Sequence, residues 1–450
     1  MGASPGLVPP FCDMEWHMTR ILIHMNDQKK SGRIMMEIII PEDVKVIITM
    51  IEHSGHEAYV VGGCVRDILM GREPDDWDIT TSATPEEIKR IFVKTVDTGI
   101  KHGTVTVIVR GNGYEVTTYR IDGDYADGRH PQNVRFTRNL REDLKRRDFT
   151  INAIAYNEKN GIKDEFGGIG DLERHLIKAV GDPFERFTED ALRMLRAIRF
   201  SAQLGFNIDG NTYNAICAMS GLIKNVSIER VQAELTKTLL SPHPELVTEF
   251  QETGLFIEIL PELNRILSSR DAKFIRPFLN HVPATVPMRY AALLSGLDHT
   301  EAKKVMKSLR LDNNTIDTAT QIIRYSKEEE KIPENEYGVR KAMSKYGPRL
   351  LENLFIFADA RIQTGEDVTG LTMRGQRLHL RTIKRYCEEI ISRGDCVNVK
   401  DLDISGTDLV NRGLRGEKVG ETLEWLLDIV LENPRLNDKE TLMAMLDNRF

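Results

Sequence analysis

The stretch "YVVGGCVRDILMGREPDDWDITT", residues 59–81, decides the fold, because two apolar runs flank a glycine pair and a group of acids. The first run predicts a strand and "VRDILMG" predicts a helix, with Gly62-Gly63 as the turn between them. Backbone N–H groups exposed at such a turn can hold triphosphate oxygens, and Arg66 adds positive charge one helical turn further on. A Gly-Gly pair also occurs in ordinary turns, so it indicates phosphate binding only together with a second motif.

The second run, "DWDITT", predicts another strand, and Asp76 and Asp78 are two positions apart on it. Side chains with that spacing leave the same face of a strand. Two carboxylates so close raise each other's pKa, and a divalent cation such as Mg²⁺ resolves the conflict. Glu115 in "YEVTTYR" is a third carboxylate if an antiparallel neighbouring strand brings it beside the pair. The alternative is that D-x-D is an ordinary loop sequence.

The segment from Pro41 to about Asn157 predicts a small α/β domain. "EDVKVIITMIEHSG" has the periodicity of an amphipathic helix, and "TPEEIKRIF" predicts a helix capped by Thr84. The alternating runs "GTVTVIVRG" and "YEVTTYRI" predict a hairpin that turns at Gly111-Asn112-Gly113. Together these elements predict a mixed sheet.

After about residue 165 the strand signals stop, and apolar residues recur at three- and four-residue spacing in segments such as "ERFTEDALRMLRAIRFSAQLG" and "ELVTEFQETGLFIEIL". We expect an α/β head followed by an elongated all-α neck, body and tail. The expected divisions are a leader at 1–35, a head at 36–165, a neck at 166–242, a body at 243–335 and a tail at 336–450.

Composition limits the class of protein. The chain has 450 residues, of which 41% are hydrophobic and 29% charged, as expected for a soluble globular protein. No apolar run is long enough to span a bilayer, and the five scattered cysteines signal neither a disulfide framework nor a zinc site. A cytoplasmic location is therefore expected. The formal net charge of −7 argues against a globally basic surface but leaves room for a local phosphate-binding patch.

The order of strand, Gly-Gly, helix with arginine and D-x-D resembles the polymerase-β-like nucleotidyltransferase superfamily. The motifs "VVGGCVRDILMG", "DDWDITT", "LKRRDFTINAIAY", "EDALRMLRAIRF" and "SIERVQAEL" are similar to successive motifs of the class II tRNA nucleotidyltransferases. That family includes CCA-adding enzymes and bacterial poly(A) polymerases. The resemblance covers residues 36–450 and implies a head of the polymerase-β-like nucleotidyltransferase type.

The resemblance also implies roles for individual residues. Asp76 and Asp78 would bind catalytic Mg²⁺ ions, with Glu115 as the third catalytic carboxylate. One ion would lower the pKa of the RNA 3′-hydroxyl and the other would neutralise the departing pyrophosphate, so no protein nucleophile is needed. The implied nucleotide-binding residues are Gly62, Gly63, Arg66, Arg147, Asp148, Asn152, Asp190, Arg193, Arg196 and Arg199.

In this family "EDALRMLRAIRF" acts as a protein template that selects the base of the incoming nucleotide. The hydrogen-bond donors and acceptors of its side chains explain which bases it accepts. Asp190 would accept from the exocyclic amino group of cytosine or adenine, and Arg193 would donate to the adjacent ring nitrogen. Uracil and guanine reverse this order and leave both charged groups unsatisfied, so CTP and ATP are expected substrates. Arg196 and Arg199 would lie toward the sugar and phosphates. Taken alone, the helix favours the simpler interpretation of a solvated face with an ordinary Asp190–Arg193 ion pair.

The expected partner is tRNA, with no DNA and no membrane. In "MRGQRLHLRTIKRY" a basic stripe at helical spacing suits an A-form phosphate backbone read by shape; its residues are Arg374, Arg377, Arg381, Lys384 and Arg385. The loop "RIDGDYADGRHPQNVRF", residues 120–136, is the expected mobile element that changes the pocket as the primer grows.

The sequence favours template-independent addition of CCA to the 3′ end of tRNA. An A-adding tRNA nucleotidyltransferase or a poly(A) polymerase shares these motifs and stays an alternative. The mildly acidic end "NDKETLMAMLDNRF" lacks the long basic extension that poly(A) polymerases of this group tend to carry. A non-catalytic RNA-binding protein is a more distant alternative, which predicts damage at metal positions that are intact here.

Overall fold

The computed structural model describes residues 38–122, 134–268, 272–327, 333–365 and 373–447. They form two compact units: the first extends to Ala197 and includes Phe206–Asn225, and the second contains Ile198–Gly205 and continues from Val226. The expected leader and residues 123–133 of the expected loop lie outside the described residues. The five-part division of the chain stays a prediction.

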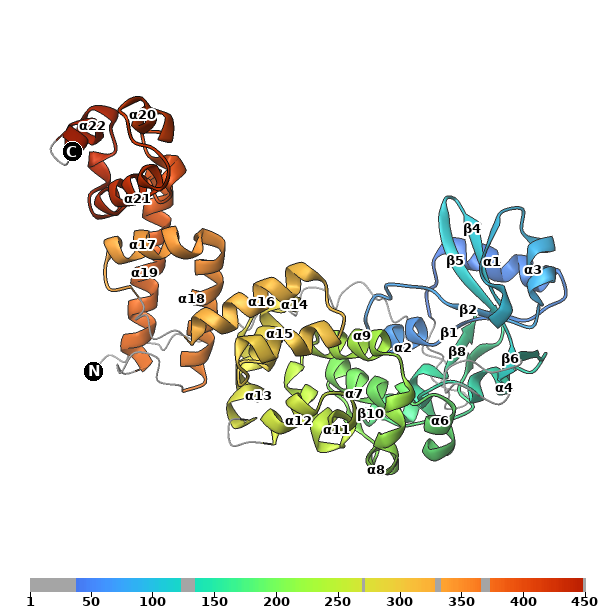
Figure 1. Ribbon diagram of the computed structural model, residues 1–450. Helices are drawn as coiled ribbons and strands as arrows, with labels where there is room; N and C mark the ends of the chain where they lie inside the picture. Colours follow the sequence, from blue (N-terminus) through green and yellow to red (C-terminus); the bar gives the residue numbers. More distant parts are fainter. Residues whose placement is uncertain (1–37, 123–133, 269–271, 328–332, 366–372, 448–450) are drawn as a thin grey trace, which may run out of the picture. The chain divides into compact units, whose positions relative to one another are not determined.

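A mixed sheet is the centre of the first unit (Figure 1). Within the described residues it has seven strands in the order β3 (Thr95–Gly99), β4 (Thr104–Val109), β5 (Asn112–Thr118), β2 (Ile79–Thr81), β1 (Ala58–Val61), β8 (Ala155–Asn157) and β9 (Gly161–Lys163). β2 and β5 run parallel, and the other neighbouring strands run antiparallel. The predicted mixed sheet is therefore confirmed, although the sequence analysis did not identify β3, β8 and β9.

The predicted β4–β5 hairpin is confirmed, but its turn lies earlier than expected. Val109 pairs with Asn112, so Arg110 and Gly111 form the turn, and both have positive φ angles of 48° and 91°. Two-residue hairpin turns of this kind match the twist of the flanking strands, and their need for positive φ explains the glycine. The segment after β5 does not continue that strand, since β6 (Arg120–Asp122) pairs with β7 (Val134–Phe136) in a separate sheet.

The helices of the first unit pack around the sheet. α1 (Glu42–His53) contacts β1 and α3 (Pro85–Ile91), and Thr84 caps α3 as predicted, within a capping box that Glu87 completes. Tyr59 and Thr80 are paired across β1 and β2 and therefore share one face, where Tyr59 packs in a core cluster with Leu144. The other helices of this unit are α2 (Gly63–Leu69), α4 (Leu140–Lys145), α5 (Gly168–Glu173), α6 (Pro183–Glu189), α8 (Gly210–Met219) and the first part of α7 (Leu192–Leu204).

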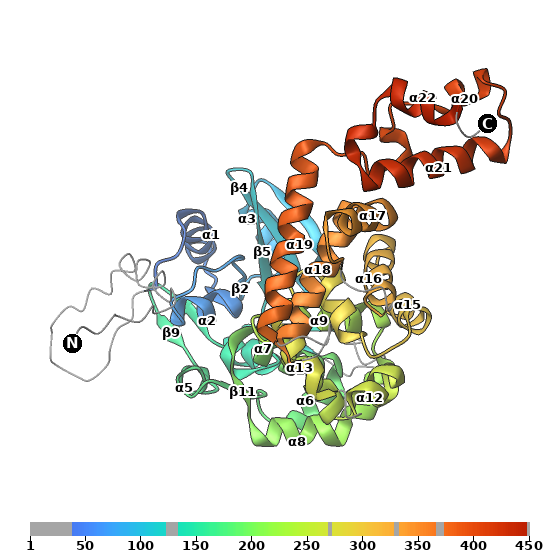
Figure 2. The same ribbon diagram turned by 90° about the vertical axis from the view of Figure 1, so that its left-hand side faces the viewer.

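All of the regular secondary structure in the described residues of the second unit is helical. Its helices are α9 (Ile228–Leu239), α10 (Glu249–Glu252), α11 (Leu255–Ile259), α12 (Pro261–Leu267), α13 (Ala272–His281), α14 (Val286–Leu293), α15 (His299–Ser308), α16 (Asn313–Ser326), α17 (Glu336–Tyr346), α18 (Pro348–Gln363), α19 (Met373–Arg393), α20 (Gly406–Asn411), α21 (Glu417–Glu432) and α22 (Lys439–Asp447). α18 lies beside α19, as Figure 2 shows. No helix in the described part of the chain is long and apolar enough to cross a membrane.

Three sequence expectations about these helices are corrected. The segment expected as one helix from residue 185 is divided into α6 and α7 at Asp190-Ala191. The segment 245–260 forms a 3₁₀ turn at Pro244–Thr248 followed by α10 and α11, because Gly254 takes a left-handed conformation with φ 84°. Strands also continue past residue 165, since β10 (Leu176–Ile177) pairs in parallel with β11 (Asn207–Ile208).

Candidate active site

The glycine turn joins β1 to α2, as the sequence predicted. Gly62 has a φ of 82°, and its amide donates to the carbonyl of Ile154 at 3.1 Å. A Cβ atom at Gly62 would lie 2.9 Å from Nη1 of Arg147. Glycine is therefore required here both by the backbone conformation and by the close approach of an arginine.

Asp76 and Asp78 lie just before β2 and not on it, because the strand begins at Ile79. This corrects the predicted strand "DWDITT". The chain is nevertheless tied to the sheet at this point, since the Asp78 carbonyl accepts from the Val61 amide at 3.0 Å. Both aspartate side chains are exposed to solvent, which suits ligands for an ion.

The strand that carries Glu115 is parallel to β2 and not antiparallel as expected. Ile79 pairs with Val116, so the next position back in the same register brings Asp78 opposite Glu115. Glu115 is exposed on β5. The role of Glu115 as a third carboxylate stays a prediction.

The electrostatics of the aspartate pair fit a cation. Desolvation raises the pKa of Asp78, Arg147 opposes this rise, and the neighbouring charge of Asp76 adds to it. A divalent ion would offset both the desolvation and the repulsion, and carboxylate oxygens are the ligands that Mg²⁺ prefers. Among the described residues, no group of three or more His, Cys, Asp or Glu side chains is arranged to hold a metal ion. The structure therefore offers two candidate ligands, Asp76 and Asp78.

Arg147 follows α4 and points toward the glycine turn. Its Nη1 lies 3.5 Å from the carbonyl of Asn152, and its Nη2 lies 3.7 Å from Oδ2 of Asp143. Its buried Nε has no hydrogen-bond partner within the described residues. A guanidinium with such long contacts has hydrogen-bonding capacity left for an anionic ligand.

A chain of polar contacts connects the glycine turn to α7. Arg66 donates from Nη1 to Oδ1 of Asn152 at 2.7 Å, and Asn152 donates to Oδ1 of Asp148 at 3.1 Å. Oδ2 of Asp148 accepts from Nε and Nη2 of Arg196 at 2.8 and 2.6 Å. Burial alone would raise the pKa of Asp148, but Arg196 and Asn152 hold it well below its usual range. The structure thus brings together four residues that the sequence analysis had assigned to nucleotide binding.

Asp190 lies between α6 and α7, which corrects its predicted position inside a helix. Its Oδ1 accepts from the amide of Leu192 at 3.0 Å, so its carboxylate begins α7 as a cap. Arg193 is buried, and it donates to the carbonyls of Arg186 at 3.1 Å and Arg146 at 2.7 Å. It also forms an ion pair with Glu189 at 2.5 Å. These contacts fix the guanidinium of Arg193 in the core of the unit.

Arg199 lies on the part of α7 that belongs to the second unit. It forms a buried ion pair with Glu234, donates to Gln203 at 2.5 Å and stacks 3.7 Å from the ring of Phe200. These partners support a structural role for Arg199. Its assignment to nucleotide binding stays a prediction.

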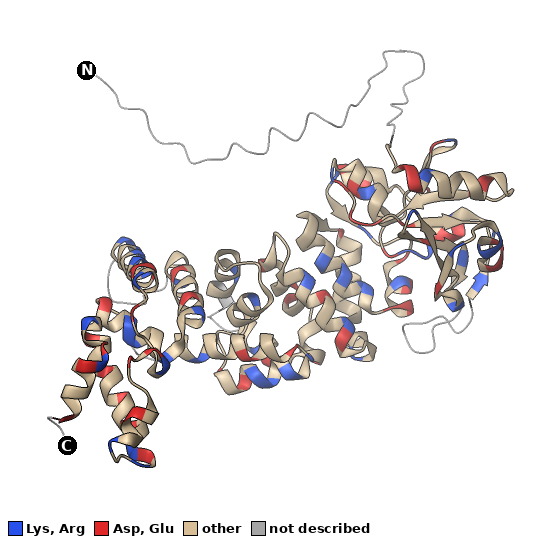
Figure 3. Cartoon of the chain, turned by 90° about the horizontal axis from the view of Figure 1, so that it is seen from above, with Lys and Arg blue, Asp and Glu red and all other residues tan. Residues whose placement is uncertain are grey.

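The predicted basic stripe lies on α19, and its five residues are exposed: Arg374, Arg377, Arg381, Lys384 and Arg385. Arg377 approaches Asp359 at 3.6 Å, and Arg385 approaches Glu389 at 3.7 Å. Figure 3 shows Lys and Arg positions interspersed with Asp and Glu positions along the ribbon of the described residues. Arg377, Arg381 and Lys384 also line a cleft of about 720 Å³ between α18 and α19. RNA binding by this stripe stays a prediction.

The sequence analysis missed two acids that hold arginines of the site. Asp143 contacts Arg146 and Arg147, and Glu189 contacts Arg193. The available signal was spacing, because each acid precedes its arginine by three or four residues, the separation of neighbours on a helix. That signal is common on solvated helices and does not identify buried pairs.

Comparison with known proteins gives the family. Residues 58–178 match the family "Poly A polymerase head domain", residues 205–267 match "Probable RNA and SrmB- binding site of polymerase A", and residues 287–446 match "tRNA nucleotidyltransferase domain 2 putative". A CCA-adding enzyme of Geobacillus kaustophilus is 38% identical over 410 residues, which is 90% of this chain and 96% of the relative. The chain belongs to the CCA-adding enzyme family.

Other members of the CCA-adding enzyme family agree with this assignment. The Limosilactobacillus fermentum CCA-adding enzyme is 37% identical over 405 residues, covering 89% of this chain and 95% of the relative. The crystal structure of the Bacillus stearothermophilus CCA-adding enzyme in complex with CTP matches with a TM-score of 0.73 at 30% identity, covering 91% of this chain and 98% of that one. A Thermotoga maritima CCA-adding enzyme complexed with tRNA is 21% identical with a TM-score of 0.61, which supports the fold. The expected family and fold class are thus confirmed.

Proposed function

We propose that this chain adds C, C and A to the 3′ end of tRNA, using CTP and ATP and releasing pyrophosphate. The observation that carries the proposal is the set of Asp76, Asp78, Arg147 and the Gly62 turn on a chain that matches CCA-adding enzymes over nearly their whole length. The relatives' names and the CTP and tRNA complexes of similar proteins support the substrates. Cytoplasmic tRNA is the corresponding primer.

The triphosphate is bound by the glycine turn and its arginines in this proposal. The backbone at Gly62 and Gly63 can approach an anion closely because neither residue has a side chain, and Arg66 and Arg147 supply positive charge. Asp76 and Asp78 would hold Mg²⁺, which when bound activates the RNA 3′-hydroxyl and neutralises the triphosphate. The remaining task of the protein is to align the nucleotide with the primer, which is the main protein contribution to phosphoryl transfer.

Base choice is assigned to Asp190 and Arg193. Arg193 is held by Glu189 and two backbone carbonyls, so its direction is set before a nucleotide binds. A preorganised donor loses little entropy on binding a base and strongly disfavours a base that presents another donor. Arg196 is tied to Asp148 and through it to Asn152 and Arg66, which supports a shared scaffold for base and phosphate binding.

The primer is assigned to the helical second unit. The exposed stripe on α19 carries five basic side chains on a chain whose net charge is −7, so attraction to RNA phosphate has to be local. Such contacts give shape recognition and strong salt dependence.

The direct test uses purified protein, Mg²⁺ and tRNA transcripts that end at the discriminator base, at C and at CC, each with one labelled nucleoside triphosphate. Addition of C, then C, then A supports the proposal. Addition of A alone to the CC transcript would indicate an A-adding enzyme, and long A tracts on unrelated RNA would indicate a poly(A) polymerase. Absence of any product, with RNA binding retained, would indicate a non-catalytic binder.

A further inference from the structure

Asp143 is a fully buried carboxylate beside the site and has no assigned role. Its exposure is 0%, and α4 carries it onto the face of the sheet where Thr80 lies. Its Oδ1 accepts from Nε of Arg146 at 2.9 Å and from the amide of Arg120 at 3.3 Å. Its Oδ2 accepts from Oγ1 of Thr80 at 3.0 Å and faces Arg147 at 3.7 Å. This one side chain therefore joins α4, β2 and β6.

Two of these partners lead directly to the proposed site. Thr80 is two positions after Asp78 and lies in β2, the strand that directly follows the aspartate pair. Arg147 approaches the glycine turn, and its positive charge acts on Asp78. A displacement of Asp143 would thus move both the strand that follows the aspartate pair and the arginine that faces it.

We propose that Asp143 is a positioning residue of the nucleotidyl-transfer site, which holds Arg147 against the Gly62 turn and fixes β2 behind Asp78. This inference rests on the proposed function. Burying a carboxylate is costly unless it is paired and hydrogen-bonded, and Asp143 has two arginines, a hydroxyl and an amide. Asp143 contacts both the strand that follows the aspartate pair and the arginine that approaches the glycine turn. A residue that only stabilised the fold would not need to contact both parts of the site.

Thr80→Val tests this link most sharply, because it removes one hydroxyl from the Asp143 shell and keeps the shape of the side chain. We expect kcat for addition of both C and A to fall roughly 10- to 100-fold, the kinetic equivalent of one hydrogen bond to a charged group. CTP binding measured by calorimetry without tRNA should weaken, and KM for tRNA should stay unchanged. Thr80→Ser should restore most of the rate, because it keeps the donor.

Thr118→Val is the matched control. Thr118 is a fully buried threonine on the neighbouring strand β5, and its hydroxyl donates to the carbonyl of Ala83 at 2.7 Å, away from Asp143. Thr118→Val should lower the melting temperature about as much as Thr80→Val does, and it should leave kcat and CTP binding unchanged. Asp143→Asn should lower kcat further than Thr80→Val. If the asparagine variant does not fold, the comparison of the threonine variants still tests whether Asp143 is a positioning residue.

The inference is overturned if Thr80→Val matches Thr118→Val in kcat and CTP affinity while both lose the same stability. Failure of the wild-type protein to extend any tRNA would instead overturn the proposed function. The two failures are therefore distinguishable in one set of assays.

Discussion

At the scale of single residues, Asp76 and Asp78 differ from most acids of the first unit because they carry adjacent charges at the start of a central strand. They are exposed, and the positive charge of Arg147, which follows α4, acts on Asp78. The two negative charges repel each other and so destabilise the fold, but both carboxylates can serve as ligands for a cation. Substitutions at these two positions should therefore reduce activity without reducing the stability of the fold.

Asp78→Asn should reduce nucleotide addition by at least about 10³-fold, since a neutral amide is a poor Mg²⁺ ligand. The melting temperature should stay the same or rise, because the variant removes repulsion from Asp76. Single-turnover addition of C and thermal unfolding are the measurements. Asp75→Asn, an exposed acid in the same segment, is the control and should keep activity. Equal loss in both variants would argue against a specific metal role.

Asp148 predicts a pH dependence of stability. Its pKa is lower in the folded state than the ordinary value near 4, so its ion pair with Arg196 stabilises the fold above that pH. Asp148→Asn should lower the free energy of unfolding by about 3 kcal/mol at pH 7. The difference from wild type should shrink as the pH falls below about 4, because wild-type Asp148 then becomes protonated on unfolding.

Urea unfolding at several pH values measures this difference. Asp97→Asn is the control, because Asp97 pairs with Lys89 at the surface with a side chain that is 51% exposed. Its effect should be small at every pH. A stability difference for Asp148→Asn that is constant from pH 7 to pH 3 would contradict the assignment.

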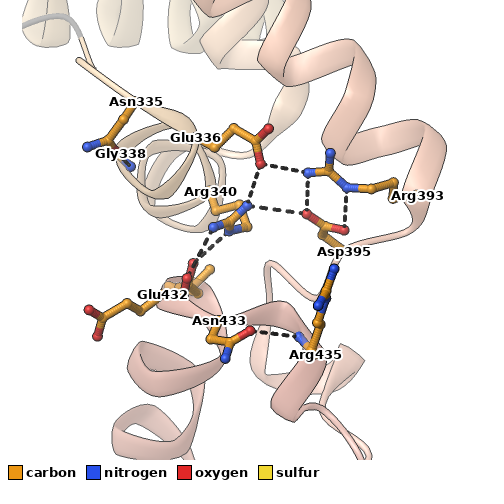
Figure 4. A network of polar contacts seen from close by, with 10 residues as sticks. Asn335, Glu336, Gly338, Arg340, Arg393, Asp395, Glu432, Asn433 and Arg435 are labelled. Carbon is orange, nitrogen blue, oxygen red and sulfur yellow. Dashed lines mark hydrogen bonds and ion pairs between the residues drawn. The ribbon is translucent and has the colours of Figure 1, made fainter.

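At the scale of elements, the structure shows how helix ends are held. α7 begins at a carboxylate cap from Asp190, and this break from α6 brings Glu189 onto Arg193. The C-terminal end of α21 is held differently, by the buried Arg340 of α17, which donates to the carbonyls of Leu431 and Glu432 at 2.6 and 3.3 Å (Figure 4). Carbonyls at a helix end have no partner within the helix, so such an arginine acts as a C-cap.

Arg340→Leu should destabilise the bundle of α17, α19 and α21 by about 3 kcal/mol. The variant leaves two backbone carbonyls and part of the Glu336 and Asp395 carboxylates without a donor in a buried place. Hydrogen exchange of the α17 and α21 amides is the measurement. Arg393→Leu is the matched control, because Arg393 contacts the same two carboxylates but its side chain is 45% exposed, and it should cost below about 1 kcal/mol. Similar costs for both would show that burial is not what matters.

At the scale of the whole molecule, chemistry and primer binding are assigned to different units of the chain. The carboxylate pair and the glycine turn belong to the first unit, and the basic stripe of α19 belongs to the second. Substitutions in the stripe should therefore change primer affinity and leave nucleotide binding intact.

The double variant Arg377→Glu and Arg381→Glu should raise KM for tRNA at least about tenfold, because each phosphate contact contributes to a salt-dependent affinity. The slope of log affinity against log salt should become shallower, and KM for CTP should not change. Lys224→Glu, an exposed lysine of the first unit, controls for a change in overall charge. An unchanged KM for tRNA in the stripe variant would remove α19 from the RNA interface.

The sequence by itself predicted several local elements and the residues of the candidate site. Periodicity indicated α1 and α3, because an amphipathic helix needs only residues near one another in the chain. The Gly-Gly turn and D-x-D predicted phosphate and metal binding because each motif keeps its groups together in a short stretch, and the family resemblance implied the role of Arg147 in "RRDF".

Only the tertiary structure decided which distant groups meet. The parallel pairing of β2 with β5 brings Glu115 into register with Asp78, and the fold of α4 onto β2 brings Asp143 to Thr80. The same packing buried Arg193 and Arg199 in ion pairs with Glu189 and Glu234 and left the arginines of α19 exposed. Arginines at similar spacing cannot be distinguished from the sequence. Their roles differ only in the folded protein, where packing determines how deeply each charge is buried and which group it contacts.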